Sequence, residues 1–188
     1  MKNMPSTDDA TTSPSPVILV VMGVSGSGKT TVATALSERL GWPYEEGDSL
    51  HPKANVEKMA SGHPLNDDDR WPWLEKVTEW AEGLLADGRS GVITCSALKR
   101  SYRDLINRSG NGIRFVYLQG EKSLIAERLA ARRGHYMPAS LLDSQFADLE
   151  EPAVDEPAIR VHIGPAPNEI VDTIMKRLKL ERPEKAEK

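Results

Sequence analysis

The sequence predicts an α/β fold in which a five-stranded parallel sheet is flanked by helices. Short apolar runs alternate with segments of helical pattern along most of the chain, and this alternation is typical of a parallel sheet covered on both faces. A glycine-rich segment directly follows the first apolar run. We expect strands at residues 17–22, 43–46, 91–95, 113–118 and 158–163, and helices at about 28–40, 54–61, 72–87, 98–108, 121–133, 138–149 and 168–180.

The carboxyl ends of parallel strands lie at one edge of the sheet, and ligands bind beyond that edge. The residues that follow each strand are therefore the first candidates for function.

The residues after the first strand fit the phosphate-binding pattern G-x-x-x-x-G-K-[ST]. Glycine tolerates the backbone angles that let successive N–H groups converge on one anion. The helix that follows, which Gly41 is suited to end, presents its positive N-terminal end to the same place. Lys29 supplies a mobile charge for the β- and γ-phosphates, and the Thr30 hydroxyl is suited to a Mg²⁺ ligand. We predict that ATP and Mg²⁺ bind here. The alternative is a tight turn without a ligand. The residues predicted to bind the nucleotide are Gly23, Val24, Ser25, Gly26, Ser27, Gly28, Lys29, Thr30 and Thr31.

A carboxylate follows the second strand, in the segment Glu46-Gly47-Asp48. The topology alone places Asp48 close to the transferred phosphate. A carboxylate at this place could accept a proton from an attacking hydroxyl or hold Mg²⁺ through water. The alternative is that Asp48 caps the next helix. We favour the catalytic role because of the position at the strand end.

The connection between the second and third strands, residues 47–90, is longer than a minimal crossover, and we interpret it as a substrate-binding insertion. Its Lys58 and Arg70 could engage an anionic substrate. Three consecutive acidic residues form either a solvated turn, in which Asp69 caps the tryptophan-containing helix, or part of the functional site. The tryptophans are assigned to packing rather than to substrate stacking, and the histidines lack the clustering of a zinc site.

The third strand ends in Cys95-Ser96, where ATPase motors and GTPases usually carry an aspartate that reaches the metal. The sequence also lacks the GTPase patterns Asn-Lys-x-Asp and Asp-x-x-Gly. These features argue against a motor or a GTPase, and Cys95 is expected to be a small buried residue.

A lid is predicted after the fourth strand, at about residues 128–150. Its first helix carries Arg128 and Arg132, which share a face because they are four residues apart, followed by Arg133. The segment 133–138 is expected to break this helix. A helix, a break and a second helix fit a lid that brings arginines onto phosphates; the alternative is an ordinary charged helix end.

Composition excludes several classes of protein. The 188 residues carry a formal charge of −4 and no basic stripe, so nucleic acid is not an expected partner. No segment has the ~20 apolar residues of a membrane span, the first residues do not resemble a signal peptide, and one cysteine excludes an internal disulfide. We expect one cytoplasmic domain at residues 16–180, between disordered tails at 1–15 and 181–188.

Further motifs carry a resemblance to the small P-loop gluconokinases over about residues 17–180. They are Glu46-Gly47-Asp48, His51-Pro52, Asn55, Lys58-Met59, Gly62-x-Pro64-Leu65, Asp67-x-Asp69-Arg70-x-Pro72-Trp73-Leu74, Cys95-Ser96-Ala97-Leu98-Lys99-x-x-Tyr102-Arg103-Asp104, Arg132-x-Gly134-His135, Ser144-Gln145-Phe146 and Leu149-Glu150-x-Pro152. The chain departs from the family where Leu105-Ile106-Asn107 stands in place of Leu-Leu-Arg.

The resemblance implies a nucleoside-monophosphate-kinase-like P-loop kinase fold, commonly a homodimer, that uses ATP to phosphorylate D-gluconate at its 6-hydroxyl. On this basis we expect Lys29, Asp48 and Arg132 to be catalytic, Arg128 and Arg132 to contact the nucleotide, and Thr30 and Asp48 to meet Mg²⁺. The expected acceptor ligands are Asp48, His51, Lys58, Arg70 and Arg103. A kinase for shikimate or a related sugar acid, a nucleotide kinase, and a regulator that has lost catalysis are the alternatives.

Overall fold

The computed structural model describes residues 13–132 and 139–183. Its five strands form one parallel sheet in the order β2-β3-β1-β4-β5. The predicted strands are confirmed, and each observed boundary lies within one residue of its expected position. The strands are β1 (Ile18–Met22), β2 (Tyr44–Glu46), β3 (Gly91–Thr94), β4 (Ile113–Gln119) and β5 (Ala158–His162).

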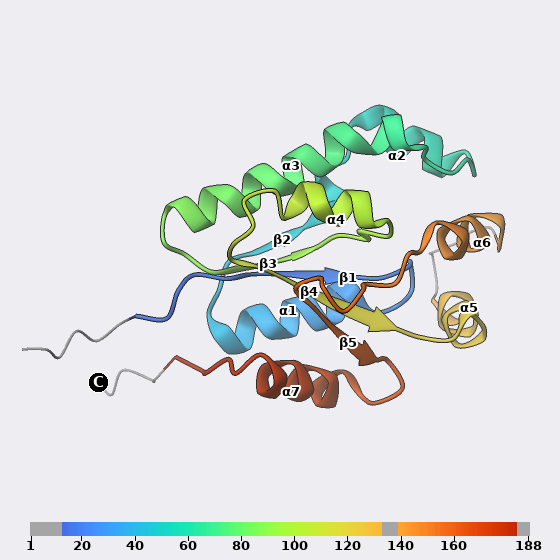
Figure 1. Ribbon diagram of the computed structural model, residues 1–188. Coiled ribbons are helices and arrows are strands. Elements are labelled where there is room, and N and C mark those ends of the chain that lie inside the picture. The colour runs from blue at the N-terminus through green and yellow to red at the C-terminus, as the bar shows by residue number, and fades with distance from the viewer. Residues whose placement is uncertain (1–12, 133–138, 184–188) are drawn as a thin grey trace, which may run out of the picture.

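Strand β1 is buried on both faces, which explains its uninterrupted apolar sequence. Leu19 and Val21 belong to a core shared with α1 (Lys29–Leu40) and α7 (Pro167–Arg177). Ile18, Val20 and Met22 belong to the opposite core, shared with α3 (Asp67–Ala86) and α4 (Arg100–Ile106). Figure 1 shows α1 and α7 on one side of the sheet and α3 and α4 on the other.

Helix α3 begins five residues before its predicted start. Asn66 is its N-cap: its side chain accepts from the Asp69 N–H at 2.8 Å, and the Asp69 carboxylate accepts from the Asn66 N–H at 2.9 Å. This reciprocal capping box starts the helix, which then runs through Pro72 at the loss of one backbone hydrogen bond. The cap is therefore Asn66, and Asp69 completes the box.

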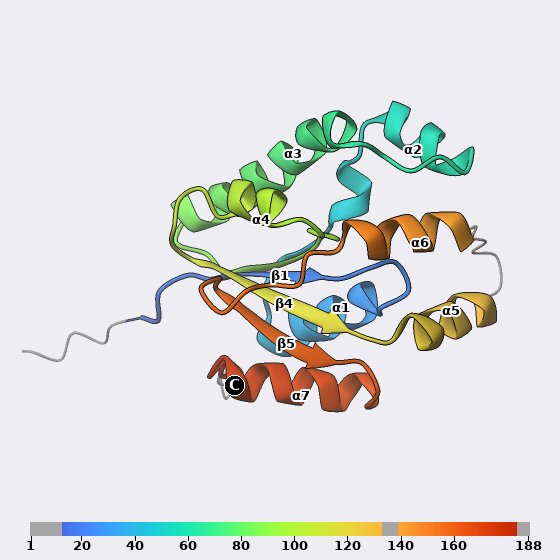
Figure 2. The ribbon, with the colours of Figure 1, turned by 45° about the vertical axis from the view of Figure 1, so that its right-hand side comes forward.

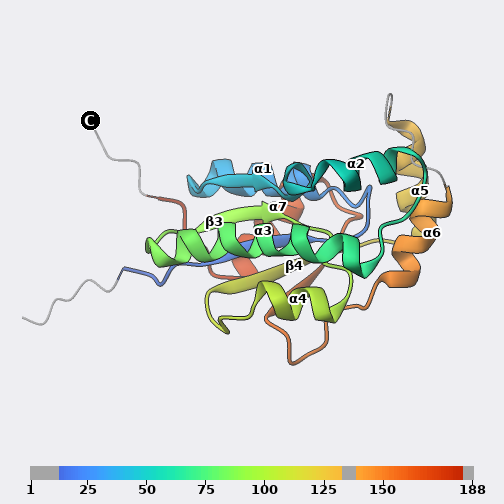
Figure 3. The same cartoon turned by 90° about the horizontal axis from the view of Figure 1, so that it is seen from above.

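The remaining elements lie beyond the carboxyl ends of the strands. They are the 3₁₀ helix η1 (Gly47–Leu50), α2 (Lys53–Ala60), α5 (Lys122–Ala131) and α6 (Ala139–Asp148). Figures 2 and 3 show α2, α5 and α6 gathered at this end of the molecule. The predicted helix break at 133–138 lies outside the described residues. Within residues 13–132 and 139–183, no helix has the length and apolar character needed to cross a membrane.

Candidate active site

The phosphate loop joins β1 to α1 and takes backbone angles that favour glycine. Gly23, Gly26 and Gly28 have φ values of 147°, 82° and 93°. A Cβ on Gly26 would lie 2.6 Å from the Leu129 side chain of α5. The loop therefore needs glycine both for its own curl and for the close approach of α5.

Lys29 lies at the start of α1 and folds back over the loop. Its ammonium donates to the carbonyl oxygens of Gly23 and Val24 at 3.1 and 3.0 Å. Burial lowers the pKa of Lys29, and the nearby carboxylate of Asp48 only partly offsets this effect. The Ser27 hydroxyl in the same loop is buried and has no hydrogen-bond partner among the residues that the structure describes. A phosphate would supply an acceptor for the hydroxyl and a counter-charge for the ammonium, so the residues present fit ATP.

Thr30 and Glu46 connect the phosphate loop to the end of β2. The Thr30 hydroxyl donates to the Glu46 carboxylate at 2.9 Å, and the Thr94 hydroxyl donates to the same carboxylate at 2.6 Å. Tyr44 also donates to Glu46. Sequence reasoning assigns no role to Glu46, although an acidic residue that ends a strand two residues before Asp48 is a readable signal.

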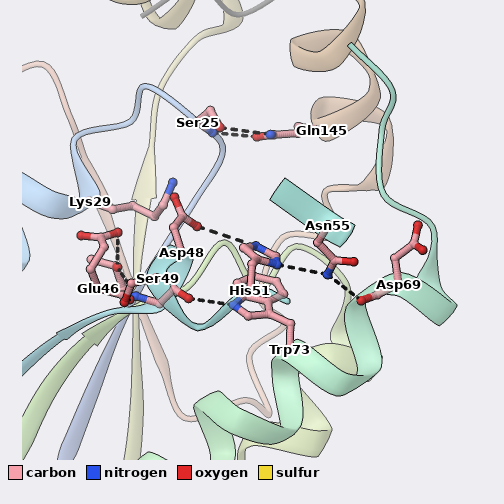
Figure 4. Close-up of polar contacts among 12 residues, drawn as sticks. Ser25, Lys29, Glu46, Asp48, Ser49, His51, Asn55, Asp69, Trp73 and Gln145 are labelled. Carbon is pink, nitrogen blue, oxygen red and sulfur yellow. Dashed lines mark hydrogen bonds and ion pairs between the residues drawn. The ribbon is translucent and has the colours of Figure 1, made fainter. Parts of the chain in front are cut away.

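Asp48 lies on η1, where hydrogen bonds of the preceding Gly47 hold the backbone and the Asp48 side chain is exposed. The Gly47 N–H donates to the Thr94 hydroxyl at 3.0 Å, and the Trp73 indole donates to the Gly47 carbonyl at 2.8 Å. A Cβ on Gly47 would lie 1.8 Å from the Thr94 carbonyl oxygen, so only glycine fits. The Asp48 side chain is 72% exposed. Figure 4 shows its carboxylate beside the Lys29 ammonium.

These oxygen donors also fit Mg²⁺. The ion favours oxygen ligands, and it is commonly held by one or two carboxylates together with substrate phosphates and water. The hydroxyl of Thr30 and the carboxylates of Glu46 and Asp48 provide such donors at the mouth of the loop. In the described part of the chain, no group of three or more His, Cys, Asp or Glu residues could hold a metal ion by itself.

His51 lies behind Asp48 rather than in the open site. Its side chain is only 4% exposed and stacks on Trp73, with the ring centroids 4.0 Å apart. Burial lowers the pKa of His51 to about 4. The ring is thus neutral and covered, so the predicted contact of His51 with the acceptor would require the ring to become more exposed than it is here.

Lys58 lies on α2 and Arg70 on α3, and each is paired with an acid. Lys58 lies 2.6 Å from the Asp69 carboxylate. Arg70 donates to Asp148 of α6 and to the Tyr102 hydroxyl of α4, both at 2.9 Å. An anionic acceptor would meet both cations in competition with the carboxylates of the protein itself.

Arg103 is buried in an ion pair with Glu156. Its guanidinium donates to Glu156 at 2.6 and 3.1 Å and to the carbonyl oxygens of Ala97 and Leu98 at 2.9 and 3.1 Å. The side chain is 1% exposed. Protein acceptors thus surround the guanidinium, so the predicted contact of Arg103 with the acceptor would require its ion pair with Glu156 to open.

The predicted lid approaches the loop through α5 and α6. Arg132 is exposed at the end of α5, and its charge contributes to the lowered pKa of Lys29. Arg128 instead donates to the Ile163 carbonyl at 2.8 Å, at the end of β5. A contact that the sequence does not reveal ties α6 to the loop: Gln145 accepts from the Ser25 N–H at 2.7 Å and donates to the Ser25 hydroxyl at 3.0 Å.

Two other predicted residues have simple environments. Thr31 is exposed in the first turn of α1. Cys95, at the end of β3, is 1% exposed, and burial raises the pKa of its thiol to about 12. The expectation of a small buried residue in place of the strand-end aspartate is confirmed.

The chain is similar to known proteins over most of its length. Residues 18–152 match the AAA domain family. The chain is 51% identical to a gluconokinase of Gluconobacter oxydans over 88% of this chain and 93% of that protein. It is 46% identical to the thermoresistant gluconokinase of Escherichia coli over 77% and 82% of the two chains. A solved gluconokinase structure from Sinorhizobium meliloti superposes with a TM-score of 0.79 at 47% identity, covering 87% of this chain and 93% of that one.

The phosphate loop and the strand-end carboxylate thus occur in a chain that shares about half its residues with these enzymes along most of their length. The chain belongs to the gluconokinase family.

Proposed function

We propose that this protein transfers the γ-phosphoryl group of ATP to the 6-hydroxyl of D-gluconate, giving 6-phospho-D-gluconate and ADP. The observation that carries the proposal is the placement of Asp48, an exposed carboxylate beside Lys29 at the phosphate loop. Membership of the gluconokinase family supports gluconate as the acceptor.

On the nucleotide side, residues 23–31 would surround the phosphates. Lys29 would exchange its two loop carbonyls for phosphate oxygens. Arg132 would approach from α5 when the predicted lid closes, while Arg128 reaches the nucleotide only if it leaves the Ile163 carbonyl. Preorganised positive groups of this kind stabilise the charge that develops on the transferred phosphoryl group.

Thr30 and Asp48 would hold Mg²⁺, with Glu46 supporting the Thr30 hydroxyl. When bound, the ion neutralises charge on the β- and γ-phosphate oxygens.

On the acceptor side, Lys58 and Arg70 would bind the gluconate carboxylate. Lys58 is already paired with the Asp69 carboxylate and Arg70 with the Asp148 carboxylate. The gluconate carboxylate would therefore replace a carboxylate of the protein. In the reaction, the 6-hydroxyl oxygen forms a bond to the γ-phosphorus as the bond to the β–γ bridging oxygen breaks. The hydroxyl proton passes to the Asp48 carboxylate, and ADP leaves.

A coupled assay for ADP tests the activity, with ATP and Mg²⁺ present and a panel of acceptors. The panel contains gluconate, shikimate, a nucleoside monophosphate and the neutral polyol glucitol, and mass spectrometry identifies the product. We expect rapid turnover with gluconate alone. Preference for shikimate or the nucleotide would assign a different acceptor, and ATP binding without turnover on any acceptor would indicate a regulator.

Variants of the site test the assigned roles. Asp48→Asn should lower kcat strongly while nucleotide binding survives, and Lys29→Ala should lower turnover with every acceptor. Asp68→Asn is a matched control, because Asp68 is an exposed aspartate in the first turn of α3. Near-normal turnover of Asp48→Asn would remove Asp48 as the proton acceptor.

We also propose that the protein is a homodimer in the cytoplasm, as the family resemblance implies. Size-exclusion chromatography with light scattering tests the oligomeric state.

A further inference from the structure

The ring of His51 is clamped behind Asp48 by groups that leave it little freedom. One face stacks on Trp73, with the planes inclined by 19°. The indole of Trp73 is itself fixed by its hydrogen bond to the Gly47 carbonyl. The position of the imidazole is therefore set by the same indole that holds the backbone next to Asp48.

Asn55 determines which ring nitrogen of His51 carries the hydrogen. The Asn55 amide nitrogen donates to the backbone carbonyl of Asp69 at 2.8 Å, and because a carbonyl can only accept, this contact fixes the orientation of the amide. The same nitrogen lies 3.3 Å from Nδ1 of His51 and must donate to it. With Nδ1 accepting, the hydrogen of the ring is on Nε2.

The burial of Asn55 supports a specific role. Asn55 is the buried residue of α2, where an apolar side chain would pack more readily and favour the helix more. Its two donor hydrogens are used by Asp69 and His51. A polar residue at this buried position is explained if its hydrogen bond to His51 is needed for function.

The Nε2–H of His51 faces Asp48. Nε2 lies 4.0 Å from Oδ1 of Asp48, longer than a hydrogen bond. The carboxylate is exposed and can rotate through this difference, and catalytic hydrogen bonds are often long until the substrates bind. Figure 4 shows the resulting chain of contacts from Asp69 through Asn55 and His51 to Asp48.

We propose that His51 is a positioning residue for Asp48: its Nε2–H, presented by Asn55, binds Oδ1 and leaves Oδ2 directed at the hydroxyl of the acceptor. The inference rests on the proposed role of Asp48 as proton acceptor. An exposed carboxylate without such a contact samples several rotamers, and only some of them reach the acceptor hydroxyl. The contact with His51 would select a rotamer that does. It also gives His51 a function that requires no contact with the substrate.

The test compares two substitutions of His51. His51→Phe keeps the ring on Trp73 but has no N–H, and His51→Gln places an amide N–H close to the former Nε2. We expect His51→Phe to lower kcat about tenfold to hundredfold, with the KM for ATP within about twofold of wild type and the urea midpoint retained. His51→Gln should recover most of the lost kcat. His63→Phe, at an exposed histidine in the loop after α2, is the matched control and should have no effect.

A double-mutant comparison separates positioning from a general structural effect. In an Asp48→Asn background, His51→Phe should cause no further loss of kcat, because the carboxylate that it positions is gone. Asn55→Leu should reproduce the kcat loss of His51→Phe at unchanged KM for ATP, and it keeps the test valid if His51→Phe fails to fold.

The inference is overturned if His51→Phe keeps its kcat, if it lowers kcat by the same factor with and without the Asp48 carboxylate, or if His51→Gln gives no recovery. Failure of the proposed function has a different signature, since Asp48→Asn would then itself retain activity.

Discussion

Replacing Glu156 by Gln is expected to destabilise the protein while leaving acceptor binding unchanged. Glu156 is the buried partner of Arg103, and their side chains are only 4% and 1% exposed. Two hydrogen bonds join them, and the same carboxylate accepts from the Ala153 N–H at 2.7 Å. Gln preserves the shape of the side chain but removes the negative charge that balances a guanidinium shielded from water.

The size of the effect follows from this burial. Removing one partner of a buried ion pair costs about 3–5 kcal/mol, because the other charge stays buried without compensation. Gln can keep one of the two hydrogen bonds, which favours the lower end, about 3 kcal/mol. At about 2–4 °C per kcal/mol for a domain of this size, the Tm should fall by about 6–12 °C.

Urea unfolding followed by tryptophan fluorescence measures the change, since Trp73 lies in the core and Trp80 packs against it. The neighbouring Asp155→Asn is the matched control. Asp155 also accepts two hydrogen bonds from an arginine, Arg100, at 3.0 and 2.7 Å, but both side chains are exposed. Water screens that pair, so its loss should leave the urea midpoint unchanged.

The KM for gluconate should be unaffected in both variants. If Glu156→Gln unfolds at the wild-type midpoint, the reasoning from burial is refuted. If it instead raises the KM for gluconate at full stability, the prediction that Arg103 is an acceptor ligand is supported.

Three further predictions concern the loop and the elements around it. Gly47→Ala should abolish soluble, active protein, because its Cβ would lie 1.8 Å from a backbone oxygen of β3. Gly83→Ala is in open space inside α3, and urea unfolding should show a free energy of unfolding that is higher by up to about 1 kcal/mol. The pKa of His51 is about 4 in the folded protein, against an ordinary value of 6.5, so the unfolded chain binds the proton first as the pH falls. The free energy of unfolding should therefore decrease between pH 6.5 and pH 4, by up to about 3 kcal/mol. Urea titrations of His51→Phe should lack this part of the pH dependence. Gln145→Leu frees the Ser25 N–H and should tighten binding of a non-hydrolysable ATP analogue up to about tenfold by calorimetry, while weaker binding would mean that Gln145 supports the loop.

The strands and the phosphate loop are predictable because their signals are local. An apolar run such as β1 must be buried on both faces, and the spacing of glycines before Lys29 leaves few alternatives. The start of α3 can also be predicted from the sequence, since Asn66 and Asp69 have the spacing of a capping box. The predicted start at Pro72 is too late because it relies on the proline and not on this spacing. Local signals thus place the elements to within a residue or a turn.

The partners of charged side chains are not predictable in the same way. Glu156 is 53 residues from Arg103 in the sequence, and Asp148 is 78 residues from Arg70. Arg70 and Arg103 lie in two separate family motifs, and neither motif shows which acid its arginine contacts in the folded chain. Only the environments in the fold distinguish the buried ion pair of Arg103 from the partly open ion pair of Arg70.

The acceptor side also explains how one site could couple two substrates. Arg70 holds Asp148 at the end of α6, and three residues earlier on the same helix Gln145 holds Ser25 of the phosphate loop. In the proposed reaction, phosphates compete with Gln145 at the loop, and an acceptor carboxylate competes with Asp148 for Arg70. Both competitions act on one turn of α6, so each substrate would weaken one of two polar contacts of this turn. Both contacts are exchanged only when both substrates are present. A neutral polyol offers no carboxylate for the exchange at Arg70, so the arrangement favours an acidic acceptor.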